Sequence, residues 1–286
     1  MESPKQNPVY VVLGATGGIG SATCRRLAKE GARLILAGRS TDKLNALAHE
    51  LNATSVVLDA TRFEEVEACF KQALEENGSV DGAVNCVGSL LLKPAHSTSP
   101  EEWEQTLATN LGSAFATVRA ATSAMKSDGG SIVLLSSAAA EVGLVNHEAI
   151  SAAKAGIIGL ARAASASYAN RGIRINCVAP GMVRTPLTAH ITDNEMALKG
   201  SVAMHPLGRI GEADDIAAAI AFLLQPSQNW ITGQVLGVDG GLAHVRTRAR
   251  RSTDFEDRLT LVACGLWLVE LAPPAGRLKA GRANST

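Results

Sequence analysis

Short apolar runs alternate with helix-length amphipathic stretches from about residue 9 to residue 241, and this alternation constrains the fold more than any other feature. Parallel strands joined by crossover helices produce such a pattern. Several runs, such as Val9–Leu13, are apolar at successive positions, as expected when helices cover both faces of a sheet. The sequence therefore predicts an α/β fold with a doubly wound parallel sheet of seven strands in one domain.

The expected elements are assigned from this apolar pattern. The strands are Val9–Leu13, Arg33–Ala37, Ser55–Leu58, Gly82–Asn85, Ser131–Leu135, Ile173–Val178 and Gln234–Val238. The helices are Gly18–Glu30, Asp42–Leu51, Phe63–Glu76, Glu101–Met125, Ala149–Ala169 and Ala213–Leu224. Sheets of this kind bind ligands beyond the carboxyl ends of their strands. We therefore expect a binding site in the loops that follow the strands.

The composition limits the classes of partner. The 286 residues carry 27 basic and 27 acidic side chains, so no net field attracts nucleic acid or an anionic membrane. The 5 cysteines include no C-x-x-C pair, which argues against a disulfide framework and a zinc site, and no metal is expected. The N-terminal residues show no export signal. We expect a cytoplasmic protein whose partners are small molecules or copies of itself.

The alternating pattern stops near Val245. We therefore expect one α/β domain over residues 1–244 and a loosely ordered extension over residues 245–286. The extension holds a cluster of arginines and an apolar stretch, residues 259–272, which is shorter than the roughly 20 residues needed to span a bilayer. A helix that docks on the core or on a neighbouring subunit is the simplest interpretation, and a membrane or nucleic-acid contact is the alternative.

A glycine-rich loop follows the first expected strand. It reads Gly14-Ala15-Thr16-Gly17-Gly18-Ile19-Gly20 and leads directly into a helix. A bound pyrophosphate needs the loop backbone close by, and side chains at Gly14, Gly18 and Gly20 would obstruct it. Glycines can also serve only a strand-to-helix turn. The position after the first strand of an alternating α/β pattern nevertheless favours nucleotide binding.

Further motifs follow the glycine loop in order. They are Asn85-Cys86-Val87-Gly88 after the fourth strand, Asn110 in the next helix, Ser137 after the fifth strand, and Pro180-Gly181 with Val183 and Thr185 after the sixth. With the G-x-x-x-G-x-G loop, this set resembles the short-chain dehydrogenase/reductase family over about Val9 to Gly241. The resemblance implies a Rossmann fold and an oxidoreductase. It implies cofactor contacts at Gly14, Thr16, Gly17, Gly18, Ile19, Gly20, Arg39, Ser40, Asp59, Asn85, Val87, Gly88, Lys154, Pro180, Gly181, Val183 and Thr185.

The end of the second strand indicates which cofactor is used. Gly38-Arg39-Ser40 lacks the acidic residue that would bind both ribose hydroxyls of NAD. Gly38 leaves room for a phosphate, Arg39 can pair with it and Ser40 can assist, so we expect NADP(H). The alternative for Arg39 is an exposed charge at a helix entry. By resemblance, Asp59 would accept a hydrogen bond from the adenine amino group, although an aspartate after a strand can equally cap a helix.

The resemblance also implies a catalytic mechanism, and one residue departs from it. In the family, a tyrosine donates a proton to the substrate oxygen, a lysine four residues later lowers the pKa of the tyrosine and binds the ribose, and a serine orients the substrate. Ser137, Asn110 and Lys154 match the family pattern. The tyrosine position holds Ile150, which has no titratable group. Tyr10 and Tyr168 lie in the first strand and late in the fifth helix.

Three interpretations of this departure stay open. His147 stands seven residues before Lys154, the spacing at which the divergent enoyl-thioester reductases of this superfamily place their tyrosine, and an imidazolium can donate a proton. A hinge or surface role for His147 is the alternative. Solvent could instead supply the proton, or the chain could bind its cofactor without turnover, as a sensor or a silent subunit. Glu148 is most simply a carboxylate at a helix N-terminus, with a proton relay as its alternative.

The segment from Arg184 to Gly211 resembles the substrate lid of the family. Its apolar residues are Leu187, Met196, Met204 and Leu207, which favour an apolar substrate or belong to the core. His190 and His205 are expected to be loop residues and not metal ligands. We expect NADP(H)-dependent reduction of a ketone, such as a 3-oxoacyl group, in a small apolar substrate. By resemblance, the helices Glu101–Met125 and Ala149–Ala169 would pair subunits in a homotetramer or homodimer.

Overall fold

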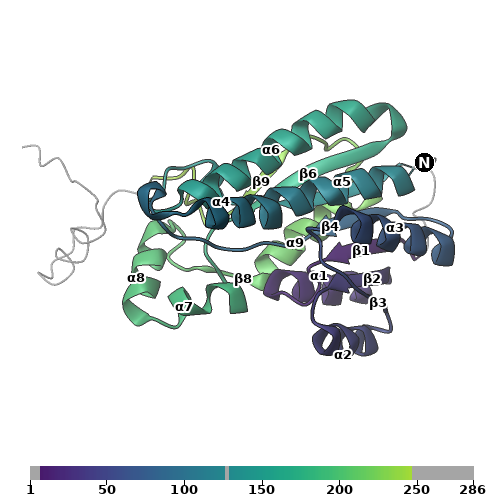
Figure 1. Cartoon of the computed structure of the whole chain (residues 1–286), viewed down its shortest axis with the longest axis horizontal. Coiled ribbons are helices and arrows are strands. Elements are labelled where there is room, and N and C mark those ends of the chain that lie inside the picture. Colours follow the sequence, from purple (N-terminus) through teal and green to yellow (C-terminus); the bar gives the residue numbers. More distant parts are fainter. Residues whose placement is uncertain (1–6, 126–128, 247–286) are drawn as a thin grey trace, which may run out of the picture. The chain divides into compact units, whose positions relative to one another are not determined.

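A seven-stranded parallel sheet forms the centre of the computed structural model, which describes residues 7–125 and 129–246 (Figure 1). The strands lie in the order β3-β2-β1-β4-β5-β6-β9. Their bounds are β1 Val9–Leu13, β2 Arg33–Gly38, β3 Thr54–Val57, β4 Gly82–Asn85, β5 Gly130–Leu135, β6 Ile173–Pro180 and β9 Val235–Val238. The predicted α/β fold class and all seven predicted strands are confirmed, with ends displaced by at most two residues.

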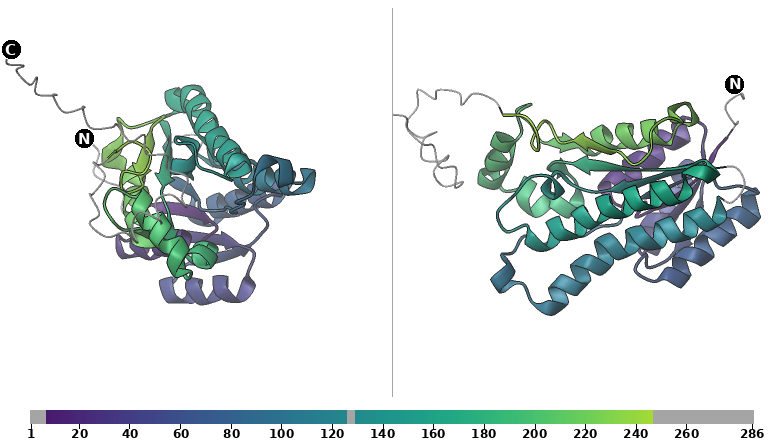
Figure 2. Two further views of the ribbon diagram at one scale, coloured as in Figure 1. Left: turned by 90° about the vertical axis from the view of Figure 1, so that its left-hand side faces the viewer. Right: turned by 90° about the horizontal axis from the view of Figure 1, so that it is seen from above.

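Helices cover both faces of this sheet (Figures 1 and 2). On one face lie α1 Gly18–Lys29, α2 Thr41–Leu51 and α9 Ala213–Leu224; on the other lie α3 Phe63–Asn77, α5 Ser113–Ala124 and α6 Glu148–Tyr168. Alternate residues of β1 enter opposite cores: Val11 packs with α3 and α5, and Val12 packs with α1 and α9. This two-sided burial explains why β1 is apolar at every position.

The predicted helix Glu101–Met125 is wrong as a single regular helix. It consists of α4 Pro100–Leu107, a π-helical segment η2 at Ala108–Gly112, and α5. Ser99 caps the start of α4, where its hydroxyl accepts from the Glu102 backbone N–H and the Glu102 carboxylate accepts from the Ser99 N–H. Short π-helical segments occur frequently at functional sites, and this one contains Asn110.

Two short strands were not predicted. β7 Val183–Arg184 pairs in parallel with β8 Gly211–Glu212 in a separate two-stranded sheet. Between them lie α7 Ala189–Thr192 and α8 Glu195–Met204, which form the segment expected to be the lid. Strands of two residues are too short to show an alternating pattern in the sequence.

The loops that carry the predicted motifs leave neighbouring strands of the main sheet. β1 lies between β2 and β4, so the strand order reverses direction at β1, and ligands bind at such a point in doubly wound sheets. Residues 247–286 of the expected extension lie outside the described residues, and its boundary at residue 245 stays a prediction. Within the described ranges, no helix is long and apolar enough to cross a membrane.

Candidate active site

The loop between β1 and α1 leaves no room for side chains at three glycines. Gly14 has φ +73°, and a Cβ there would lie 2.8 Å from the carbonyl carbon of Cys86. A Cβ on Gly20 would collide with the carbonyl oxygen of Gly14, and a Cβ on Gly18 would lie 2.7 Å from the Thr185 methyl carbon. The first turn of α1 carries no acidic residue. This bare backbone and helix N-terminus fit the phosphates of a dinucleotide.

The end of β2 presents a basic side chain next to this loop. A Cβ on Gly38 would lie 3.6 Å from the hydroxyl oxygen of Thr16, so the two loops are neighbours. Arg39 and Ser40 are exposed, and Arg39 makes no ion pair with any residue that the structure describes. The Arg39 guanidinium is therefore available for an added phosphate group.

Asp59 closes the turn that precedes α3. Its Oδ1 accepts hydrogen bonds from the backbone N–H of Thr61 at 2.9 Å and from the Thr61 hydroxyl at 2.8 Å. The Thr61 N–H is the largest cause of the lowered pKa of Asp59, and the positive charge of Arg39 adds a smaller effect. The carboxylate thus has a capping role in the turn, and a contact with adenine stays a prediction.

Lys154 lies buried on α6, against the end of β5. Its Nζ donates to the carbonyl oxygen of Leu135 at 2.9 Å, and the Ser136 hydroxyl donates to the Lys154 carbonyl oxygen at 2.9 Å. Burial lowers the pKa of the ammonium group to about 8, and the nearby thiols of Cys86 and Cys177 oppose this shift. These contacts with the end of β5, directly before Ser137, hold Lys154 in place.

Gly88 lies between Asn110 and Lys154. A Cβ on Gly88 would be 3.1 Å from Asn110 Oδ1 and 3.6 Å from Lys154 Nζ. The Asn110 amide is fixed in orientation, because its Nδ2 donates to the Thr106 carbonyl oxygen at 2.9 Å and its Oδ1 accepts from the Ser89 N–H at 3.3 Å. Three motifs that are far apart in the sequence therefore meet after β4, with an acceptor oxygen near the ammonium group.

Asn85 supports the same region from the end of β4. Its Oδ1 accepts from the Val87 N–H at 2.9 Å, which shapes the turn before Gly88. Its Nδ2 donates to the hydroxyls of Thr117 at 2.8 Å and Ser113 at 3.3 Å on α5. The side chain of Asn85 thus connects the turn to the helix that follows Asn110. Its expected role in cofactor binding is consistent with a positioning effect through this turn.

Ser137 follows β5 and begins the short 3-10 helix η3, Ala138–Ala140. Its Oγ accepts from the Ala139 N–H at 3.2 Å, and the residue is partly buried. The hydroxyl proton is not used in this bond. Ser137 is therefore able to donate to a substrate oxygen while its own oxygen stays fixed by the backbone.

The position of the missing tyrosine is closed and apolar. Ile150 is 3% exposed on α6, one helical turn before Lys154, so both side chains lie along the same side of the helix. Tyr10 is buried in β1, and Tyr168 stands at the end of α6 with Arg171 over its ring. Eighteen residues of helix separate Tyr168 from Ile150, about 27 Å. Neither tyrosine can replace the acid.

His147 lines a surface pocket of about 380 Å³ between η3 and the start of α6. Its Nδ1 is 2.7 Å from the carbonyl oxygen of Val145, which assigns the proton to Nδ1 and leaves Nε2 for other contacts. In the described part of the chain, no hydrogen bond joins His147 to Ser137, Asn110 or Lys154. The structure places His147 beside the site and not in direct contact with its other polar groups.

Glu148 connects the start of α6 to the loop after β4. Its Oε1 accepts from the backbone N–H of Ala95 at 3.4 Å, and the Lys93 N–H donates to the Asn146 carbonyl oxygen at 2.7 Å. Glu148 is also the only acidic residue in the first turn of α6. These contacts support the expected role at the helix N-terminus.

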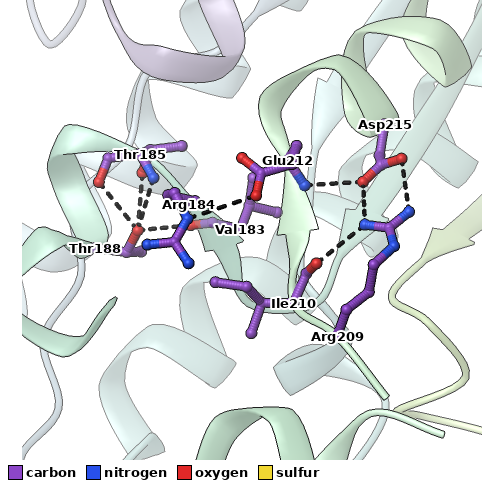
Figure 3. Close-up of polar contacts among 8 residues, drawn as sticks. All are labelled: Val183, Arg184, Thr185, Thr188, Arg209, Ile210, Glu212 and Asp215. Atoms are coloured by element: carbon purple, nitrogen blue, oxygen red, sulfur yellow. Dashed lines mark hydrogen bonds and ion pairs between the residues drawn. The ribbon is translucent and has the colours of Figure 1, made fainter. Parts of the chain in front are cut away.

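Two ion pairs lie at the ends of the segment expected to be the lid, where it joins the rest of the domain (Figure 3). Arg184 on β7 pairs with Glu212 on β8 at 3.5 Å. Arg209 pairs with both carboxylate oxygens of Asp215 at 2.7 and 3.0 Å. The Thr188 hydroxyl donates to the Val183 carbonyl oxygen at 2.6 Å and completes a turn that starts at Thr185. These two ion pairs were not predicted from the sequence, because their partners are separated by up to 28 residues.

The segment expected to be the lid exposes apolar side chains and is anchored by a buried histidine. Met196 is 79% exposed and Leu207 is 74% exposed, so these two are not core residues. His205 is buried; its Nδ1 lies 2.6 Å from the Ser201 carbonyl oxygen, and its Nε2 accepts from the Met182 N–H at 3.1 Å. His205 lies in the loop after α8, as expected, and it is buried there, where it holds the segment after Pro180-Gly181 in place.

Known proteins are similar to this chain in sequence and in fold. A family model described as enoyl-(acyl carrier protein) reductase matches residues 14–243. The short-chain dehydrogenase/reductase aba4 of Botryotinia fuckeliana (strain B05.10) is 36% identical over 253 residues, covering 83% of this chain and 97% of that protein. This chain belongs to the short-chain dehydrogenase/reductase family. The chain is accordingly an oxidoreductase, and the resemblance seen in its motifs is confirmed.

Two further relatives of this short-chain dehydrogenase/reductase are close in sequence or structure. The 3-oxoacyl-[acyl-carrier-protein] reductase FabG of Escherichia coli (strain K12) is 34% identical over 244 residues, covering 83% of this chain and 98% of that protein. A solved structure of an actinorhodin polyketide ketoreductase variant with NADPH has a TM-score of 0.80 and 30% identity, covering 85% of this chain and 100% of that one. The individual roles of Ser137, Asn110, Lys154 and His147 stay predictions.

Proposed function

We propose that this short-chain dehydrogenase/reductase uses NADP(H) to reduce the carbonyl group of a small, mostly apolar substrate. The observation that carries the proposal is the position of Gly88 between Asn110 Oδ1 and Lys154 Nζ, next to the glycine loop. The relatives named as a 3-oxoacyl reductase and as a ketoreductase with NADPH support the same reaction class.

Each residue of the site has a role that its contacts support. When bound, NADP(H) supplies the hydride, and the bare loop around Gly14 would hold its phosphates. The Lys154 ammonium group uses one donor on Leu135 and keeps two for the ribose hydroxyls. The Ser137 hydroxyl donates to the substrate oxygen and so fixes the orientation of the carbonyl group. The fixed Oδ1 of Asn110 can hold a water molecule near Lys154.

The panel experiment that tests the function compares reaction types. NADPH consumption is measured over ketones, quinones and enoyl thioesters, with the Lys154→Ala variant as the control that must lose the signal. We expect consumption with ketones. Consumption with enoyl thioesters alone would favour the second candidate, an enoyl-thioester reductase, which the spacing of His147 from Lys154 supports. Tight NADPH binding without any consumption would identify a silent cofactor-binding protein.

Arg39 is expected to set the preference for NADPH. The Arg39→Ala variant should bind NADPH about 10- to 100-fold more weakly, because a charge-assisted hydrogen bond contributes about 1.5–3 kcal/mol, and it should bind NADH unchanged. Dissociation constants from nicotinamide fluorescence test this. Arg33→Ala is the matched control, since Arg33 is equally exposed at the opposite end of β2. Tighter binding of NADH than of NADPH by the unmodified protein would overturn the assignment.

His147 is proposed to pass a proton to the substrate oxygen through a water molecule. We expect His147→Phe to lower kcat at least about tenfold, because general acid catalysis contributes 10²–10⁴-fold and a relayed proton gains part of this. His49→Phe, on α2, is the control. Unchanged turnover in the His147 variant would end this hypothesis and leave solvent as the proton source.

A homotetramer or homodimer is proposed for the assembly. Trp103 on α4 is 41% exposed and Phe115 on α5 is 46% exposed, and these helices belong to the pair expected to join subunits. Large exposed apolar side chains on one surface mark protein contacts. Light scattering should give two or four times the chain mass, and Phe115→Glu should reduce it. A monomeric mass for the unmodified protein would contradict the proposal.

A further inference from the structure

The pocket beside His147 is formed by the same two elements that hold the candidate catalytic residues. Its volume is about 380 Å³. One wall is η3, which Ser137 begins, and the other is the first turns of α6, which carries Lys154. The lining residues are Ala139, Ala140, Glu141, Val142, Gly143, Leu144, His147, Glu148 and Ser151. His147 is the candidate catalytic residue that lines the pocket, and Ser137 and Lys154 lie on the two elements that form its walls.

The charge of this pocket is negative. Glu141 and Glu148 are its acidic lining residues, and neither lysine nor arginine lines it. The nearby bases are already engaged: the Lys93 ammonium group pairs with both carboxylate oxygens of Glu102 at 2.9 and 2.7 Å, and His244 Nε2 lies 3.7 Å from Glu141. Glu148 uses one oxygen in its long contact with the Ala95 N–H and keeps the other.

Apart from His147, the rest of the pocket wall is apolar or small. Ala139, Ala140, Val142 and Leu144 supply aliphatic surface, and Ser151 on α6 supplies a hydroxyl. Such a surface accepts a compact aliphatic ring. A ligand with a positively charged amine would be attracted by the two carboxylates that line the pocket, whereas a phosphate-bearing thioester carrier would bring like charge toward them.

We propose that the pocket selects small ketones that carry a positively charged amine and disfavours anionic ketones and acyl-thioester substrates. This inference rests on the proposed carbonyl reduction at Ser137 and adds the charge of the substrate to it. The attraction acts across a partly exposed pocket, so it is a preference of about tenfold between a cationic and an anionic ketone at low salt, and it weakens as salt screens the charges.

Three cyclic ketones of matched size test the charge preference. The first, 1,1-dimethyl-4-oxopiperidinium, carries a positive charge opposite its carbonyl group. The second, tetrahydropyran-4-one, is neutral, and the third, 4-oxocyclohexane-1-carboxylate, carries a negative charge at the same position. Binding of each to the complex with NADP⁺ is measured by titration calorimetry, and turnover is measured separately with NADPH. We expect the order cation, neutral, anion in affinity, with about tenfold between the first and the last at low salt.

Variants of the two carboxylates locate the effect. Glu141→Gln combined with Glu148→Gln should bring the cation-to-anion affinity ratio close to one, whereas Glu104→Gln, an exposed change on α4, should leave the ratio as it is. A ratio that survives the double variant would show that other residues recognise the charge and would overturn the proposal.

The affinity and turnover measurements distinguish the charge preference from the proposed carbonyl reduction. The expected affinity order without turnover would support the charge preference and contradict carbonyl reduction. Turnover of the ketones with equal affinities, or with the anion bound most tightly, would support carbonyl reduction and overturn the charge preference. No binding of any of the three ketones would contradict both.

Discussion

Ile150→Tyr is expected to turn over a ketone about 100-fold faster than Ile150→Phe. Ile150 lies one helical turn before Lys154 on α6, so a tyrosine hydroxyl there would come near an ammonium group that stabilises the phenolate. A positioned general acid contributes 10²–10⁴-fold. The serine, the lysine and the fixed amide of Asn110 are already in place, and only the acid is added.

The comparison with phenylalanine isolates the hydroxyl group. Ile150 is buried, and an aromatic ring of either kind disturbs the packing at this position. Both variants therefore carry the same steric cost, which thermal unfolding measures independently. Equal kcat values for the tyrosine and phenylalanine variants, at equal melting temperatures, would show that the remaining site does not complete the catalytic arrangement.

Lys154→Met is expected to lose at least about 100-fold in turnover without losing stability at pH 7. The methionine fills a similar volume but has no ammonium group for the ribose or for the proton chain. Burial lowers the pKa of Lys154 from 10.5 to about 8, so at pH 7 the native protein holds a charged group where a neutral one is preferred. Removing that charge offsets the loss of the hydrogen bond to Leu135.

The pH dependence of stability checks the state of Lys154 directly. Between about pH 8 and pH 10.5 the unfolded chain keeps the proton and the folded chain releases it, so the native protein gains stability relative to the methionine variant as the pH rises. Over this whole pH range, the free energy of unfolding of the native protein rises by roughly 3 kcal/mol relative to the variant. Urea unfolding of both proteins at pH 7, 8, 9 and 10 measures the difference. A difference that stays constant with pH would place the ammonium group in a solvated environment.

The sheet and the glycine loop could be predicted because their physical requirements leave a local pattern. A strand buried on both faces, such as β1, must be apolar at every position. A tight turn between a strand and a helix must lack side chains where the backbone packs closely, as it does at Gly14 and Gly20. The order of the later motifs and their distance from Lys154 also made the change at Ile150 visible without a structure.

The contacts that hold the site together could not be predicted in this way. Ser89 fixes the Asn110 amide across 21 residues, and His205 holds the Met182 backbone across 23 residues. No spacing rule connects positions so far apart. The π-helical segment around Asn110 differs from an ordinary helix in the hydrogen-bonding register of its backbone. Its residue types are those of an ordinary helix, so the sequence gives no signal for it.

Transfer of deuterium from the cofactor to a ketone tests the proposed function most directly. The protein is incubated with NADPH that carries deuterium at both C4 positions of the nicotinamide ring and with the best ketone of the panel. The expected product is an alcohol that carries one deuterium atom and is therefore one mass unit heavier by mass spectrometry, and Lys154→Met should form it at least about 100-fold more slowly. Tight binding of NADPH with no alcohol formed, or an alcohol without deuterium, would contradict direct carbonyl reduction at this site.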